Sequence, residues 1–125
     1  RDDHPLAGRS SISSDEIVEY PLMLPLREKI RGEILNWLKR EEKDLKIPLR
    51  YTLLSNAALL VEEGLGCAFC MDGALAIHSS PHLRFVPIHP QRTTCSGLVW
   101  KKNRLFSSAA SLFLQEINML RARME

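Results

Sequence analysis

One segment limits the possible folds most, because it places a helix between two strands within a short stretch of chain. Residues 46–54 alternate apolar and polar side chains, which is the two-residue period of a strand. Ser55 and Asn56 are both good N-cap residues for the helix that follows, and Gly64 can supply its left-handed C-cap. Residues 67–71 then form an apolar run typical of a buried strand.

The same order of elements occurs earlier in the chain. Residues 21–25 are an apolar burst bounded by prolines, which predicts a short buried strand. From residue 27 to about residue 43 the apolar side chains recur with a helical period, so an amphipathic helix is expected. Strands that alternate with helices in this way indicate an α/β fold, with a mainly parallel sheet and helices on both faces. Pro48 favours an edge or entry position for the strand that contains it.

Local signals predict the remaining elements. Ser13 and Glu16 have the spacing of a capping box, so a short helix should begin there and run to about Tyr20. A helical turn is expected over residues 74–77, and strands over residues 83–88 and 96–102. Ser107 or Ser108 can cap a final amphipathic helix, whose apolar residues include Leu112, Phe113, Ile117 and Leu120.

Composition excludes several classes of protein. A chain of 125 residues with 45% apolar content can form one ordinary domain. The net charge of +2 is too small and dispersed for this segment to hold DNA by itself. Its apolar runs are shorter than the roughly 20 residues of a membrane span, and no export signal is present, so we expect no membrane partner. The first residue is not Met, which suggests an excised piece of a longer protein.

The cysteines and histidines indicate neither a metal site nor a cofactor. An odd total of three cysteines suits a reducing compartment, and we expect a cytoplasmic protein. Cys67 and Cys70 form a C-x-x-C pattern, but residues three apart on a strand point to opposite faces, which favours core thiols over a redox pair. A zinc site would need further ligands whose spacings match no structural-zinc pattern, namely Cys95, His78, His82 or His89. No catalytic constellation is recognisable, so an enzyme is not expected.

Three segments, taken in order, resemble the effector-binding domain of LysR-type transcriptional regulators. His4-Pro5-Leu6-Ala7, together with Ile12 and Tyr20-Pro21-Leu22, is similar to the family's entry into its second lobe. Residues 61–69 read Val-Glu-Glu-Gly-Leu-Gly-Cys-Ala-Phe and resemble the family pattern V-x-x-G-x-G-[I/V]-A-[L/F]. Residues 98–102, followed by the amphipathic helix, resemble its closing strand and helix. The family often has proline directly after the buried strand, where this chain has Met71-Asp72.

The resemblance implies a type II periplasmic-binding-protein-like fold, in which an effector lies between two lobes. Residues 1–12 would then be a hinge or entry segment and residues 13–90 the second lobe. Residues 91–125 would supply the returning strand and C-terminal helix of the first lobe, with most of that lobe and the helix-turn-helix domain that binds DNA lying outside this chain. The family also implies a homodimer or tetramer. The apolar stripe of the last helix would favour self-association where the first lobe is missing.

A ligand in such a fold is expected beyond the carboxyl ends of the strands, near helix N-termini that favour anions. This places an effector site at three loops, which contain Arg27, Thr52 with Ser55 and Asn56, and Asp72. Arg27, Ser55 and Asn56 are the expected contacts of an acidic effector, because a guanidinium fork suits a carboxylate. Ser55 and Asn56 equally fit a simple capping role, and Arg27 a solvated position.

Two functions from different classes fit these features. The first is a non-catalytic sensor in a LysR-type regulator, in which a small effector modulates DNA binding and transcription. The alternative is a solute-binding protein of the same fold, which the lack of an export signal disfavours.

Overall fold

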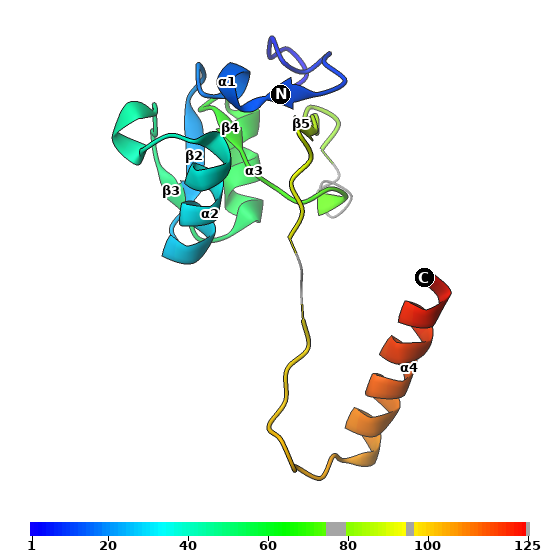
Figure 1. The fold of residues 1–125 in the computed structure, drawn as a ribbon. Coiled ribbons are helices and arrows are strands. Elements are labelled where there is room, and N and C mark those ends of the chain that lie inside the picture. Colours follow the sequence, from blue (N-terminus) through cyan, green and yellow to red (C-terminus); the bar gives the residue numbers. More distant parts are fainter. Residues whose placement is uncertain (75–79, 95–96, 125) are drawn as a thin grey trace. The chain divides into compact units, whose positions relative to one another are not determined.

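Figure 1 shows the chain in a computed structural model, which describes residues 1–74, 80–94 and 97–124. The chain divides into two compact units, Arg1–Thr93 and Thr94–Glu125.

A parallel sheet of three strands forms the centre of the first unit (Figure 1). Its middle strand, β2 (Leu22–Pro25), lies between β3 (Arg50–Tyr51) and β4 (Cys67–Ala68). The chain passes from β2 to β3 through α2 (Glu28–Leu38), and from β3 to β4 through α3 (Leu54–Glu62). The predicted parallel sheet with alternating helices is confirmed.

The burial of β2 shows that both faces of the sheet are covered. Leu22 and Leu24 belong to one hydrophobic cluster with Ile34 and Leu38 of α2. Met23 is fully buried but lies outside that cluster, because successive strand residues point to opposite faces. The small buried residues of α3, Ala57 and Ala58, are also outside it, and α3 packs on β3 and β4. The two helices therefore cover opposite faces, as the sequence predicts.

A second parallel pair completes the first unit. β1 (Ile12–Ser13) pairs with β5 (Ile88–His89) and leads directly into α1 (Ser14–Ile17). Ser13 caps α1 as predicted: its side chain accepts from the Glu16 N–H at 3.3 Å, and the Glu16 carboxylate accepts from the Ser13 N–H at 2.8 Å. The helix is shorter than expected, since it ends at Ile17 instead of near Tyr20.

The structure contradicts the prediction for the start of α3 and confirms the prediction for its end. Ser55 and Asn56 are not its caps, because the helix begins at Leu54 with Leu53 at N-cap, and no side chain caps it. The chain turns directly after β3, and the Leu53 carbonyl already accepts from the N–H groups of Asn56 and Ala57. The predicted C-cap is confirmed. Gly64 has φ +83° and donates its N–H to the Val61 carbonyl at 3.0 Å.

Several predicted elements are too long. α2 stops at Leu38 instead of residue 43, because Lys39 takes the left-handed conformation at φ 53°, and a short 3-10 turn, η1 (Glu42–Asp44), follows. The strand expected over residues 46–54 pairs along two residues, and of the strand expected over residues 83–88 only Ile88 belongs to β5. An extended segment counts as a strand only where another strand bonds to it, and β2 pairs with β3 only at Leu24 and Pro25. Of the turn expected over residues 74–77, all but Ala74 lies outside the described residues.

The second unit consists of an irregular segment and a long helix, α4 (Ser108–Met124). The predicted cap is confirmed at Ser107, whose side chain accepts from the Ala110 N–H at 3.3 Å. The strand predicted for residues 96–102 is wrong for its described part, because residues 97–102 pair with no described strand. Trp100 packs edge-on against Phe106 in this segment, with ring centroids 6.0 Å apart.

Candidate effector site

The carboxyl edge of the three-stranded sheet is the natural place for a ligand in this fold. All three strands are parallel, so they end at the same edge, where α2 and α3 begin. The strand order β3-β2-β4 means that the chain first moves to one side of β2 and then crosses to the other. Ligands of doubly wound sheets bind where the order reverses in this way, which here is the edge formed by β2 and β4.

The structure distributes the five sequence-predicted residues along this edge. Arg27 is the N-cap residue of α2, Thr52 follows β3, and Asp72 lies in a turn four residues after β4. Ser55 and Asn56 lie in the first turn of α3. All five side chains are exposed, and none makes a hydrogen bond or ion pair within the described part of the chain. They are therefore available to a ligand, but they form no preassembled cluster.

The two helices that begin at this edge differ from α1. No side chain caps α2 or α3, whereas Ser13 and Glu16 close the start of α1. The first N–H groups of a helix have no partner within it and carry a partial positive charge, so uncapped starts favour an anion. Arg27 adds a full positive charge at the start of α2.

Arg31 fixes the loop that leads into α2. One of its terminal nitrogens donates to the carbonyl of Leu26 at 2.7 Å and to that of Pro25 at 3.3 Å. Its Nε lies 3.3 Å from a carboxylate oxygen of Glu42, and the other oxygen of Glu42 accepts from Arg50 Nε at 2.8 Å. A single carboxylate thus joins α2 to β3. Arg31 was not among the residues predicted for the site, because a helical pattern does not show which carbonyl and carboxylate groups a side chain will contact.

Tyr51 fixes the other side of the edge. Its hydroxyl donates to the Phe69 carbonyl at 3.0 Å, and its backbone carbonyl accepts from the Leu26 N–H at 2.7 Å. Burial, with a contribution from Cys70, raises the pKa of Tyr51 to about 12, so the phenol stays protonated near neutral pH. From the sequence, Tyr51 is only one position of the strand expected over residues 46–54.

Cys67 and Cys70 belong to the scaffold, whereas Cys95 lies outside the described residues. Cys67 and Cys70 are free and half-buried, and burial raises the pKa of both thiols. Cys67 Sγ lies 3.8 Å from His4 Nε2, while His4 Nδ1 accepts from the Leu6 N–H at 3.2 Å. Since Nδ1 accepts, the imidazole proton resides on Nε2 and points to the sulfur. The described residues contain no group of three or more His, Cys, Asp or Glu side chains that could hold a metal ion.

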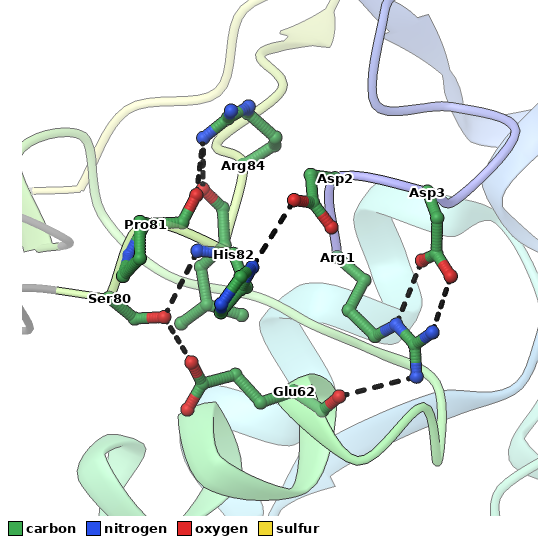
Figure 2. Close-up of polar contacts among 9 residues, drawn as sticks. Arg1, Asp2, Asp3, Glu62, Ser80, Pro81, His82 and Arg84 are labelled. Carbon is green, nitrogen blue, oxygen red and sulfur yellow. Dashed lines mark hydrogen bonds and ion pairs between the residues drawn. The ribbon is translucent and has the colours of Figure 1, made fainter.

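A separate polar cluster lies at the far end of α3, away from the carboxyl edge (Figure 2). A carboxylate oxygen of Asp2 lies 3.3 Å from His82 Nδ1, and the Asp2 N–H donates to the His82 carbonyl at 2.8 Å. Ser80 donates to the Glu62 carboxylate, and Arg1 pairs with Asp3. These contacts fasten the start of the chain to residues 80–84 around a hollow of about 400 Å³.

A larger hollow of about 660 Å³ lies beside β3, where Arg50, Glu42 and Leu26 are among its lining residues. None of the five sequence-predicted residues lines either of these two hollows. The carboxyl edge in this structure is therefore an exposed surface at those five positions.

A parallel sheet covered by helices on both faces defines an open α/β domain, a class in which ligands bind at the carboxyl ends of the strands. The chain matches the model of the LysR substrate binding domain over residues 1–121 and belongs to that family. Its fold is accordingly periplasmic-binding-protein-like, and its role is that of the ligand-sensing part of a LysR regulator. Comparison with curated proteins and with solved structures gave no match. No helix within the described residues has the length and apolar character to cross a membrane.

Proposed function

We propose that this domain binds a small acidic effector at the carboxyl edge of its sheet and thereby modulates DNA binding by the regulator. The observation that carries the proposal is the pair of uncapped helices that start at this edge, with Arg27 at the start of α2. Their free N–H groups and the guanidinium attract a carboxylate.

The polar residues beside these helix starts would hold the rest of the effector. Thr52, Ser55 and Asn56 are exposed and offer hydroxyl and amide groups beside α3. Asp72, on the opposite side of β2, offers an acceptor. We place residues 13–90 in the second lobe, residues 1–12 at the hinge, and residues 91–125 in the first lobe, so that the effector lies between lobes.

An effector in this position would act by preferring one arrangement of the regulator over another. A ligand shifts such an equilibrium only by its difference in affinity for the two arrangements. In a homodimer or tetramer, the shift would reach DNA through an N-terminal helix-turn-helix domain of the regulator.

The test is a thermal-shift screen of the intact protein against small carboxylic acids, followed by titration of the best one. A bound acid raises the melting temperature, and the rise grows with the logarithm of its concentration relative to its Kd. Arg27→Ala should weaken binding by about tenfold or more, the usual effect of losing a hydrogen bond to a charged group. Arg92→Ala, at another exposed arginine, is the matched control and should bind as the wild type does. Unchanged affinity in both Arg27→Ala and Ser55→Ala would contradict this placement of the effector.

A further inference from the structure

We propose that Tyr51 determines the specificity of the carboxyl edge, by selecting carboxylic acids that also carry a hydroxyl or amino group. This inference rests on the proposed function, which it extends from acidic effectors in general to hydroxy and amino acids. Tyr51 was not among the residues expected to bind the effector.

The position of Tyr51 follows from the strand order. β3 and β4 lie on opposite sides of β2 and do not pair with each other. Tyr51 on β3 nevertheless reaches the Phe69 carbonyl, just after β4, at 3.0 Å. Tyr51 is paired in register with Pro25, the last residue of β2. Its side chain therefore reaches across the end of the middle strand to the chain that follows β4.

The hydrogen bond to Phe69 defines what the phenol still offers. A phenol has one O–H donor and an oxygen with acceptor lone pairs, and the Phe69 carbonyl takes the donor. The raised pKa of Tyr51 keeps that proton in place near neutral pH. The half-buried side chain thus presents an acceptor, and the partner of an acceptor on an effector is a hydroxyl or an ammonium group.

The charges at the edge match such a molecule. Arg27 and the uncapped start of α2 lie beyond β2 and favour a carboxylate. Asp72 lies beyond β4, on the side to which Tyr51 reaches, and adds a second acceptor for an ammonium or hydroxyl donor. A carboxylate and a donor close together in one small molecule describe the class of hydroxy and amino acids.

Matched acids test the inference directly. The melting temperature of the intact protein is measured with propionate, lactate and alanine, and with succinate, malate and aspartate. We expect the hydroxy or amino member of a set to bind about tenfold tighter than the unsubstituted acid, the usual effect of one added hydrogen bond in a site of this kind. In Tyr51→Phe this preference should disappear, while the shift caused by the unsubstituted acid remains. Tyr20→Phe removes the other tyrosine hydroxyl of the chain and should keep the preference.

The outcomes separate the two proposals. Equal binding of substituted and unsubstituted acids by the wild type, or a preference that survives in Tyr51→Phe, would overturn the role of Tyr51 and leave the acidic effector standing. No shift with any acid would overturn both for these small acids. The wild-type comparison needs no variant, so equal binding there would overturn the inference even if Tyr51→Phe is poorly folded.

Discussion

The two units of the chain, Arg1–Thr93 and Thr94–Glu125, differ in where their apolar side chains lie. In the first unit the three leading residues of β2 are completely buried between two helix layers. In the second unit Val99 is 94% exposed and Leu105 is 96% exposed. Several residues of α4 are also exposed by about half, namely Leu112, Phe113, Met119 and Leu120.

The two units therefore differ in whether their apolar side chains are covered within the unit. The first contains strands and helices whose apolar faces cover one another, as a core requires. The second carries an amphipathic helix whose apolar residues have little cover within that unit, and exposed apolar patches of this kind mark interaction surfaces. Self-association through α4 stays a prediction. Three sets of substitutions test whether the two units differ in this way.

The largest effect is expected from a truncated core leucine. Leu38 is 1% exposed in the cluster beneath α2, so Leu38→Ala should lower the free energy of unfolding by about 4 kcal/mol. Leu112 is 60% exposed in α4, and Leu112→Ala should change the free energy of unfolding by less than about 0.5 kcal/mol. Urea denaturation followed by circular dichroism measures both. Similar losses in the two variants would show that the units are not different in the way described.

An intermediate effect is expected at Gly66, where the first unit is packed most tightly around a glycine. Gly66 has φ +148°, and an added Cβ would lie 2.4 Å from the Pro21 carbonyl oxygen. Gly66→Ala should therefore destabilise the unit by about 2 to 3 kcal/mol. Gly8 is the matched control, because no atom lies within 4 Å of its added Cβ. Thermal unfolding of both variants tests this, and a Gly66→Ala protein as stable as Gly8→Ala would mean that the strand entry is loosely packed.

The smallest effect compares the serine caps of the two units. Ser13→Ala removes the acceptor at the start of α1 and should cost about 1 kcal/mol of global stability. Ser107→Ala removes the equivalent acceptor of α4 and should reduce helix content at that end, without moving the main unfolding transition. Hydrogen exchange of individual amides distinguishes local from global loss. A shift of the main transition by Ser107→Ala would show that the units unfold together.

The elements that sequence analysis predicted correctly are those with short-range signals. The capping box of Ser13 and Glu16, the glycine that ends α3 and the buried strand β2 each depend on residues close in the sequence. The family assignment likewise rests on local motifs. The lengths of the elements were less predictable. The end of α2, for example, is set by the left-handed conformation of Lys39, and lysine has no preference for that conformation.

The candidate site, too, could be predicted from the sequence only in part. The loops after the strands could be located from the order of strands and helices, so Arg27, Thr52 and Asp72 were found at the carboxyl edge. The residues that hold this edge together, Arg31 and Tyr51, were not found. Their roles depend on which strand lies beside which, and a helical or alternating pattern does not contain that information.

Three properties could be predicted from the sequence alone: the alternation of strands and helices, the caps of α1 and α4, and the LysR substrate-binding domain family. These properties arise from steric and hydrogen-bonding preferences between near neighbours. The tertiary structure alone decided the strand order β3-β2-β4 and the reach of Tyr51 across the end of β2. Such contacts form only after burial has brought distant segments together, because the free energy of packing depends on all the faces that meet and not on any one segment.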